Sequence, residues 1–463
     1  MSYKIHIVPQ NRVIKAEKNE ILSDVLIKAG IPLSTYCNKK GLCRKCFIKI
    51  MRGSYPPLSD LEKDYRLACQ FRVTEDISIM IPEKSLLRDI ATLKTGISMS
   101  VRIDPSVKKY FFHIKGENIS TPQTLFEHIK SEMQIKELIV PDSITEKAER
   151  LLHKTPFGIT AVLYEEKELL DLESGNTTEK NYGLAVDIGT TTVVIELIDL
   201  NTGKTLDSVT ALNGQVQFGA DVISRIGHAY SGPKQQEELQ KAIVNTLNQM
   251  IGPLLTRSHI DPHDIYEVVA AGNTVMNHLF LGKPVHTLAV SPFTPSFTSL
   301  PPVPASSLGL KINDSTRVYI SPNIKSFVGG DISAGLIASD FSSRSGSHLF
   351  IDLGTNGEIV LKIQDKIFAT STAAGPAFEG MNLSSGMLAL PGAIHKAEFK
   401  EGLNLYTIDD QPAAGICGTG LIDLLSIFLK QGNILSSGKI ADSKKEIQVT
   451  GSIVITQKDI RDL

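Results

Sequence analysis

Four cysteines within the first 69 residues have a spacing that could hold a metal centre. They are Cys37, Cys43, Cys46 and Cys69, so three thiolates come from one short segment and the fourth from a later one. The chain has five cysteines, and an odd number crowded at one end argues against a disulfide framework. Thiolates that converge from two backbone directions suit a compact iron–sulfur cluster.

Two kinds of centre accept four cysteines, a 2Fe–2S cluster and a structural zinc ion. Zinc sites favour two short cysteine pairs, and only Cys43 and Cys46 form such a pair here. The spacing resembles that of adrenodoxin-like ferredoxins, which is one residue longer than the plant-type spacing. We therefore favour a 2Fe–2S cluster. Four basic residues surround the segment, namely Lys39, Lys40, Arg44 and Lys45. They form either a docking patch for a partner or an ordinary solvated surface.

A short motif that suits phosphate occurs twice, 165 residues apart. Residues 185–191 read AVDIGTT and residues 350–356 read FIDLGTN, each followed by a predicted strand. Glycine allows close approach, threonine hydroxyls and backbone N–H groups donate to phosphate oxygens, and the aspartate can hold Mg²⁺ directly or through water. The candidate residues are Asp187, Gly189, Thr190, Thr191, Asp352, Gly354, Thr355 and Asn356.

The repeated motif resembles the two phosphate loops of the superfamily of acetate and sugar kinases, heat-shock chaperones and actin. This resemblance implies a duplicated RNase H-like ATPase domain that binds ATP with Mg²⁺. In those chaperones an acidic residue at the start of the preceding helix positions the attacking water. Asp331, 21 residues before Asp352, has the corresponding place. Asp331 is either this catalytic base or a plain helix N-cap.

The elements that must position the cysteines have the order of a β-grasp domain. Periodicity predicts four strands and one helix, the strands at 4–8, 13–16, 47–51 and 71–81 and the helix at 21–29. The next part is typical of a small α/β unit, with helices at 125–133 and 144–152 and strands at 138–140 and 158–164. A polar stretch at 173–180 predicts a linker.

From residue 182 onward the pattern alternates between strands and helices, which is typical of an α/β domain. Strands are predicted at 183–186, 193–198, 268–271, 349–351 and 359–363, and helices at 236–250, 332–338 and 421–429. We thus predict a 2Fe–2S ferredoxin-like domain at 1–85, a linker and small middle domain at 86–178, and an ATP-binding domain at 179–463.

Charge and hydropathy exclude several classes of function. The net charge is −2, although residues 1–95 carry +7 and the remainder −9, so we expect no general affinity for nucleic acid or for an anionic membrane. No apolar stretch reaches the 18 residues of a transmembrane helix, and the first ten residues alternate like a strand rather than a signal peptide. A cytoplasmic location is therefore expected.

The whole chain resembles the reductive activators of corrinoid proteins, which combine a ferredoxin-like domain, a linker and a domain of the kinase superfamily. The motifs that carry this resemblance are DPSVKKY at 104–110, LNGQ at 212–215, FGADVISR at 218–225, GNTVM at 272–276, GPAFEG at 375–380 and GICGTG at 415–420.

The resemblance implies ATP-dependent reduction of inactive cobalt(II) to cobalt(I), with the 2Fe–2S cluster as electron donor. Its partners would be a corrinoid iron–sulfur protein or a corrinoid methyl carrier and an upstream low-potential reductant, with a homodimer left open. The alternatives are an ATP-regulated ferredoxin-type electron carrier and an activator of another low-potential enzyme. A small-molecule kinase is less favoured, because a kinase does not need a fused cluster domain.

Other chemically capable residues have simpler interpretations. Cys417 is expected to be packed in the core and not to be an activated thiolate, and His278 is expected to be a core histidine and not a residue that tunes a corrinoid or phosphate. Asp221 and Arg225 could pair or face the nucleotide, and Glu379 could contact ribose or a partner.

The end of the sequence predicts that the ATP-binding domain is incomplete at its C-terminus. No strand followed by an adenosine-binding turn is evident after Asp352, since residues 415–420 lead directly into a predicted helix. Residues 456–459 have the pattern of a capping box that opens one further helix. A full-length relative is therefore expected to continue for roughly one more domain.

Overall fold

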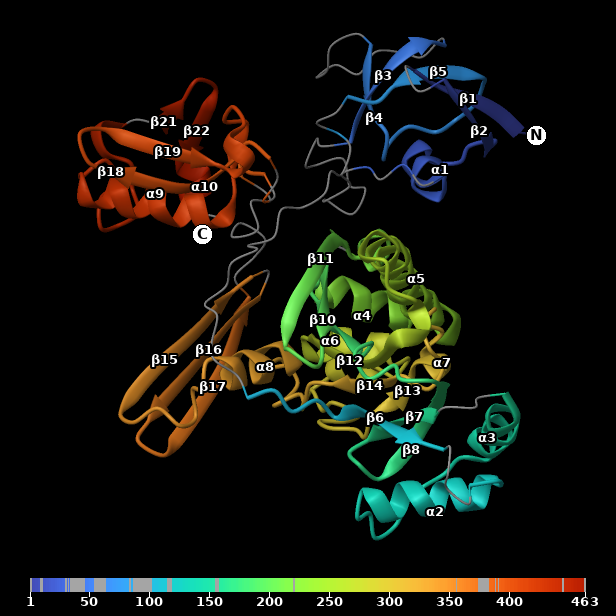
Figure 1. Cartoon of the computed structure of the whole chain (residues 1–463). Helices are drawn as coiled ribbons and strands as arrows, with labels where there is room; N and C mark the ends of the chain where they lie inside the picture. Colours follow the sequence, from blue (N-terminus) through green and yellow to red (C-terminus); the bar gives the residue numbers. More distant parts are fainter. Residues whose placement is uncertain are drawn as a thin grey trace. The chain divides into compact units, whose positions relative to one another are not determined.

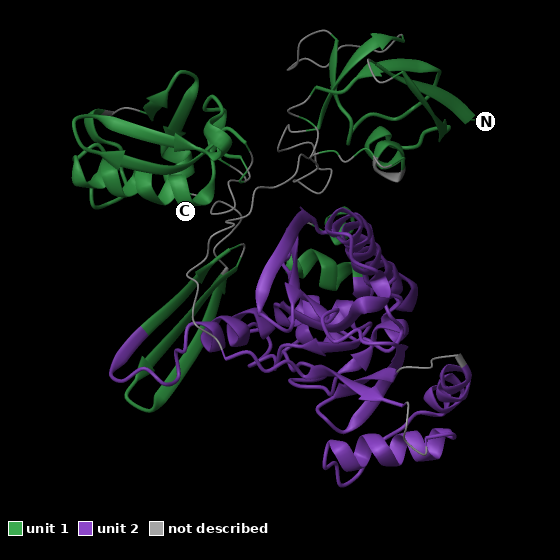
Figure 2. Ribbon diagram, in the orientation of Figure 1, with its two compact units in different colours: residues 1–94, 214–228, 349–463 green, residues 95–213, 229–348 purple. Residues whose placement is uncertain are grey.

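The computed structural model describes most of the 463 residues (Figure 1). The described residues are 2–8, 11–29, 31, 33, 46–53, 64–82, 85, 102–114, 119–154, 158–219, 221–354, 356–373, 383–387, 389, 391–443 and 445–461. Two compact units are present, one of residues 1–94, 214–228 and 349–463, and one of residues 95–213 and 229–348 (Figure 2). Within the described ranges, no helix has both the length and the apolar character needed to cross a membrane.

The N-terminal residues form a mixed five-stranded sheet and one helix, as the β-grasp pattern predicts. The strand order is β2-β1-β5-β3-β4, and β1 runs antiparallel to β2 and parallel to β5. The elements are β1 (Ser2–Val8), β2 (Arg12–Glu17), α1 (Leu22–Lys28), β3 (Phe47–Arg52), β4 (Tyr65–Leu67) and β5 (Ile77–Met80). Alternate residues of the strands are buried, which places one side of the sheet in the core.

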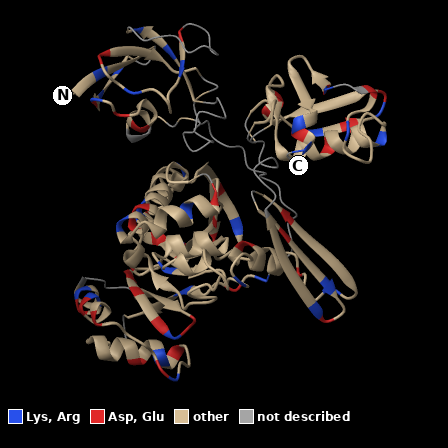
Figure 3. Ribbon diagram, turned by 180° about the vertical axis from the view of Figure 1, so that it is seen from behind, with Lys and Arg blue, Asp and Glu red and all other residues tan. Residues whose placement is uncertain are grey.

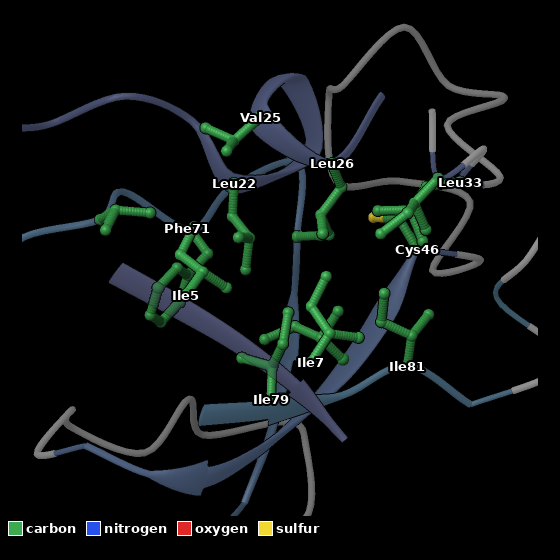
Figure 4. Close-up of a cluster of buried hydrophobic side chains, with 14 of the residues drawn as sticks. Ile5, Ile7, Leu22, Val25, Leu26, Leu33, Cys46, Phe71, Ile79 and Ile81 are labelled. Carbon is green, nitrogen blue, oxygen red and sulfur yellow. The ribbon is translucent and has the colours of Figure 1, made fainter. Parts of the chain in front are cut away.

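The core of this region joins the sheet to α1 (Figure 4). Ile5, Ile79 and Leu22 are buried together in it, and Cys46 is a member of the same cluster. Burial of each aliphatic side chain contributes about 1.5–3 kcal/mol to folding. The cysteine immediately before β3 is therefore fixed by the packing that holds the sheet together.

The predicted strand at 71–81 is wrong in its first half. Phe71 and Val73 are buried as their alternation suggests, but their backbone groups bond to residues 19–22, around the start of α1, and not to a strand. The Leu22 N–H donates to the Phe71 carbonyl and the Asn19 N–H to the Val73 carbonyl, each at 2.8 Å. Side-chain periodicity is the same in both arrangements, so it could not separate them.

Residues 107–174 form a three-stranded antiparallel sheet in the order β6-β7-β8 with two helices. The elements are β6 (Val107–His113), α2 (Pro122–Glu132), α3 (Asp142–Lys154), β7 (Gly158–Tyr164) and β8 (Glu168–Ser174). Both predicted helices and the strand at 158–164 are confirmed. The strand predicted at 138–140 is reduced to a single bridge between Ile139 and Glu168. The predicted linker at 173–180 overlaps the end of β8, because Glu173 and Ser174 still pair with β7.

The sheet of residues 182–320 has six strands in the order β11-β10-β9-β12-β14-β13. Its central strands β9, β12 and β14 are mutually parallel. Helix α5 contacts β10 and β11, whereas α6 and α8 contact β12. The elements are β9 (Tyr182–Ile188), β10 (Thr192–Asp199), β11 (Lys204–Leu212), α4 (Val222–Tyr230), α5 (Pro233–Ser258), β12 (Ile265–Gly272), α6 (Thr274–Phe280), β13 (Val303–Pro304), α7 (Ala305–Leu308), β14 (Arg317–Ile320) and α8 (Gly330–Ala338).

The remaining residues form three small sheets, two of three strands and one of two. Their orders are β15-β16-β17, β19-β18-β20 and β21-β22. The elements are β15 (Ser347–Leu353), β16 (Asn356–Ile363), β17 (Lys366–Ala373), β18 (Ala393–Phe399), β19 (Leu403–Thr407), β20 (Gly415–Ile416), α9 (Gly418–Lys430), β21 (Glu446–Thr450), β22 (Ile453–Thr456) and α10 (Gln457–Arg461). The predicted capping box is confirmed, because Thr456 and Asp459 each accept the other's backbone N–H.

Candidate functional site

Two of the four cluster cysteines lie on paired segments of the N-terminal sheet. Cys46 precedes β3 and Cys69 follows β4, and Phe47 of β3 pairs with Leu67 of β4. The Ala68 N–H donates to the Cys46 carbonyl at 2.8 Å, which brings the two cysteine segments together. Cys37, Cys43 and the four basic residues around them lie outside the described residues.

Both described thiols are buried, with relative exposures of 1% for Cys46 and 2% for Cys69. Neither forms a disulfide. Two buried thiols delivered by adjacent segments fit half of a four-cysteine centre, since the other ligands must come from the segment before β3. The donor chemistry suits a 2Fe–2S cluster, and zinc would accept the same ligands.

The first phosphate hairpin lies at the carboxyl edge of the six-stranded sheet. Asp187 is an exposed residue of β9, and the turn to β10 contains Gly189, Thr190 and Thr191. A Cβ on Gly189 would lie 2.5 Å from the Thr192 carbonyl oxygen, so this tight turn accepts only glycine. Thr190 and Thr191 are both buried, so neighbouring residues pack around their side chains.

Loops from three parallel strands meet at this edge, because parallel strands end on the same side of a sheet. Ile188 at the end of β9 is in register with Gly272 at the end of β12, and Ala270 of β12 with Ile320 of β14. The hairpin, the turn into α6 and the segment leading to α8 therefore belong to one surface. Ligands of open α/β sheets bind at such carboxyl ends.

Asp331 lies in the first turn of α8 and is not its N-cap. The N-cap residue is Gly329, which makes no side-chain capping bond. The Asp331 Oδ1 accepts the N–H of Ile332 at 2.8 Å, and the side chain is half-buried. The interpretation of Asp331 as the N-cap is therefore wrong, because Gly329 is the N-cap and the helix begins at Gly330, one residue before Asp331.

The second phosphate hairpin belongs to the other compact unit. Asp352 is near the end of β15, and the Gly354 N–H donates to the Asn356 carbonyl at 3.0 Å across the turn. Burial raises the pKa of the Asp352 carboxyl above its ordinary value. Thr355 lies outside the described residues.

The other singled-out residues are mostly structural. Cys417 is buried, and its thiol lies 3.4 Å from the Ile394 carbonyl oxygen. His278 is fully buried in the core, as expected. The Arg225 guanidinium donates to the Gly219 carbonyl at 2.9 Å and the Gln215 side chain at 3.2 Å. Asp221 accepts the Ser224 N–H at 2.7 Å, and Glu379 lies outside the described residues.

Two asparagines at the first hairpin received no role from sequence reasoning. The fully buried Asn213 donates from Nδ2 to the Gly189 carbonyl at 2.8 Å, and Asn273 donates to the Thr190 hydroxyl at 2.9 Å. Both belong to motifs that carry the family resemblance, LNGQ and GNTVM. The two motifs were the only hint in the sequence that these asparagines matter. Their contact with the hairpin becomes evident only in the folded structure.

Charges of both signs are interspersed along the described helices and strands of each unit (Figure 3). This distribution agrees with the small net charge of the chain.

Family models match four consecutive parts of the chain. The 2Fe-2S iron-sulfur cluster binding domain matches residues 5–74, and the RACo linker region matches residues 97–179. The RACo middle region matches residues 182–344, and the C-terminal domain of RACo, the ASKHA domain, matches residues 346–463. The corrinoid activation enzyme RamQ of Eubacterium limosum is 32% identical over 429 residues, which cover 92% of this chain and 70% of RamQ. The chain belongs to the RACo family of reductive activators of corrinoid proteins.

Other relatives of this RACo-family chain agree with that assignment. The [Co(II) methylated amine-specific corrinoid protein] reductase of Methanosarcina barkeri is 30% identical over 313 residues, covering 61% of this chain and 56% of the reductase. The solved structure of a reductive activator for a corrinoid, iron-sulfur protein is 32% identical and has a TM-score of 0.71, covering 99% of this chain and 81% of that one.

Membership of the RACo family confirms the predicted fold class and identifies the chain as an enzyme. Its N-terminal part is a 2Fe–2S ferredoxin-type domain, and its C-terminal part belongs to the ASKHA superfamily of ATPase-like domains. The domain boundaries predicted at residues 85 and 178 stay predictions, as do the roles of the individual site residues.

Proposed function

We propose that this RACo-family enzyme couples ATP to the reduction of an inactive cobalt(II) corrinoid protein to cobalt(I), with a 2Fe–2S cluster as the electron donor. The observation that carries the proposal is the presence in one chain of a 2Fe–2S domain and the RACo linker, middle and ASKHA regions. An electron carrier alone would not need the ASKHA part, and a kinase would not need the ferredoxin part.

The cluster would be held by Cys37, Cys43, Cys46 and Cys69. A 2Fe–2S cluster bound there would supply one electron at a reduction potential of about −400 mV, as in plant-type ferredoxins. The chain contributes the buried positions of Cys46 and Cys69, which keep water from the sulfur atoms and fix two ligands on a rigid sheet.

The corrinoid cobalt is the substrate, and it takes up one electron to pass from cobalt(II) to cobalt(I). That step is uphill from a ferredoxin-type donor, so free energy from ATP has to enter. ATP can shift the balance only if it binds one conformation of the complex more tightly than another. Such coupling would change cobalt coordination or release the reduced partner.

Each hairpin is proposed to act on ATP: Asp187 and Asp352 as anionic partners of Mg²⁺, and the residues at 189–191 and 354–356 as donors to phosphate oxygens. Asp331 would orient the attacking water from the first turn of α8. Support comes from the positions of Asp187 near the end of β9, Thr190 in the hairpin and Asp331 in the first turn of α8, which lie at the carboxyl edge of a single sheet. A cytoplasmic location is part of the proposal, because the four cysteines are expected to bind a cluster and not to form disulfides.

The test follows the visible spectrum of a cobalt(II) corrinoid protein mixed with this chain and a low-potential reductant, with and without Mg-ATP. We expect the cobalt(I) spectrum to develop only with ATP. Asp187→Ala should abolish the ATP effect, because it removes an anionic partner of the metal. Asp142→Ala, which removes an exposed carboxylate from α3 of the linker region, should behave as wild type.

Each competing function has its own signature in this experiment. Reduction at the same rate without ATP would favour a simple ferredoxin-type carrier. Binding of ATP with no effect on any cobalt(II) corrinoid protein would favour an activator of another low-potential enzyme. Asp331→Asn should leave ATP affinity largely intact and slow hydrolysis, and equal rates in this variant and wild type would exclude Asp331 as the base.

A further inference from the structure

Asn273 uses both ends of its side-chain amide to join two elements of the six-stranded sheet. Its Oδ1 accepts the Met276 N–H at 3.0 Å and so caps α6. Its Nδ2 donates to the Thr190 hydroxyl oxygen in the β9–β10 hairpin at 2.9 Å. The first bond satisfies a helix terminus. The second is not required for capping and links α6 to the proposed phosphate hairpin.

The backbone of Asn273 also supports the start of α8. A Cβ placed on Gly329 would lie 2.4 Å from the Asn273 Cα and 2.5 Å from the Thr274 nitrogen. The chain that enters α8 therefore passes in direct contact with the β12–α6 turn. Next to this contact, the Thr274 hydroxyl donates to the Lys325 carbonyl at 2.6 Å and ties the same turn to the segment before α8.

The hairpin is fixed on its other flank by Asn213. The Asn213 backbone N–H donates to the Thr191 carbonyl at 2.9 Å, and its side chain donates to the Gly189 carbonyl. Those bonds restrain the backbone of the turn, whereas the bond from Asn273 acts on the Thr190 side chain. The orientation of the Thr190 hydroxyl thus depends on a residue that also touches the start of α8.

We propose that Asn273 is a positioning residue that sets the Thr190 hydroxyl in place relative to Asp331 of α8. The proposal rests on the proposed function, in which Thr190 donates to a phosphate and Asp331 orients the attacking water. Hydrolysis requires these two groups at a fixed spacing, because a displacement of about 1 Å can slow an enzymatic step roughly 100-fold. One residue in contact with both loops is placed to maintain that spacing.

The variant that separates positioning from capping is Asn273→Ser. Serine is an equally good N-cap, so α6 should remain capped, but its shorter side chain cannot also reach Thr190. Asn273→Ala loses both functions and serves as the stability reference. Thr121→Ala removes the N-cap of α2 in the linker region and is the matched control for loss of a cap away from the hairpin.

The experiment measures kcat and KM for ATP in the full chain with a cobalt(II) corrinoid protein, together with thermal unfolding. We expect Asn273→Ser to lower kcat about tenfold or more, with a smaller change in KM and a wild-type Tm. In a Thr190→Val background the same substitution should have little further effect, since its partner is already absent. Thr121→Ala should lower Tm and leave kcat unchanged.

Two results would overturn the proposal while leaving the proposed function intact. The first is wild-type kcat in Asn273→Ser, which would reduce Asn273 to a helix cap. The second is an equal loss of kcat from Asn273→Ser with and without Thr190→Val, which would show that Asn273 acts through another group. A wild-type chain that turns over no ATP would instead overturn the proposed function itself, and this proposal with it.

Discussion

His278 shows, at the scale of one residue, how burial fixes the state of an ionisable side chain. Its Nδ1 lies 2.6 Å from the Thr274 carbonyl oxygen, its Nε2 accepts the Ser296 N–H at 3.1 Å, and its ring stacks on Phe297. These contacts require the neutral tautomer with the proton on Nδ1. Burial lowers the pKa of His278 below its ordinary value of about 6.5.

This lowered pKa predicts an acid-sensitive fold. Below about pH 6.5 the unfolded chain takes up a proton at His278 before the folded chain does, so stability should fall as the pH falls. The slope from this one group is at most about 1.4 kcal/mol per pH unit. Denaturant unfolding of wild type and His278→Gln between pH 5 and 7.5 measures it.

A variant of an exposed histidine is the control that isolates the contribution of His278 to the pH dependence of stability. His259→Gln should keep the wild-type pH dependence, because that side chain is exposed. A slope in His278→Gln as steep as that of wild type would assign the acid sensitivity to other groups.

Cys69 gives a second prediction at this scale. Cys69→Ser should remove the visible 2Fe–2S absorption, because serine is a poorer ligand for iron than a thiolate. Cys417→Ser should retain the absorption, since Cys417 is packed against the Ile394 carbonyl. Iron and zinc content after anaerobic reconstitution provides the measurement, and stoichiometric zinc without iron in the wild type would contradict the cluster.

Sequence reasoning proposed residues that would act on ligands more readily than residues that would support them. Cysteine spacing and the repeated Asp-x-Gly motif are local patterns, so the amino-acid sequence alone is enough to propose the four cysteines and Asp187 as ligand-binding residues. It is not enough to select Asn273, which is 83 residues from Thr190 and bonds to it only after β9 and β12 have paired. In the sequence, an asparagine after a strand indicates only an ordinary helix N-cap. No neighbouring residue indicates its second hydrogen bond, the one to Thr190.

At the scale of elements, long periodic segments were predictable and short or backbone-paired segments were not. Strands β7, β9 and β10 match their predicted ranges to within two residues, whereas helix α5 was predicted but runs to Ser258, eight residues past its predicted end at 250. Strand β4 has three residues, fewer than two full periods, and it was missed. Strand β6 was missed because Phe111 and Phe112 are adjacent, which interrupts its alternation.

Gly329 allows a prediction about the start of α8. Gly329→Ala should destabilise its unit by about 1–3 kcal/mol, because the new methyl group would overlap the Asn273 backbone. Gly227→Ala, inside α4 with nothing within 4 Å of the added Cβ, is the matched control. It should be neutral or stabilising by up to about 1 kcal/mol. Thermal unfolding followed by circular dichroism compares them, and equal Tm values would contradict the close approach.

At the scale of the whole molecule, the linker and middle regions share a buried polar junction. Lys109, with 1% of its side chain exposed, pairs with Glu173 at 2.8 Å and lies 4.7 Å from the centre of the Tyr266 ring. The Tyr266 hydroxyl is within hydrogen-bonding distance of Glu173, at 2.7 Å, and of Asp171, at 2.9 Å. Burial and these two carboxylates raise the pKa of Tyr266, which therefore stays protonated and donates.

This junction predicts that the two regions unfold together. Tyr266→Phe should cost about 1–3 kcal/mol, because buried carboxylates lose a donor. It should also split or broaden the thermal transition of the unit. Tyr230→Phe removes a hydroxyl from a side chain that is 68% exposed and should leave the transition unchanged. Calorimetry distinguishes these outcomes, and an unaltered transition in Tyr266→Phe would mean that the regions are only loosely joined.

Strand β12 connects the polar junction to the first phosphate hairpin, because Tyr266 lies near one end of the strand and Asn273 directly follows the other end. The two residues are seven positions apart, a span of about 23 Å at the rise of an extended strand. Hydrogen bonds to β9 and β14 brace β12 on both sides, so it can neither stretch nor buckle easily. We therefore expect β12 to move as one rigid element, so that a displacement of Asn273 would be accompanied by a displacement of Tyr266, beside the linker region.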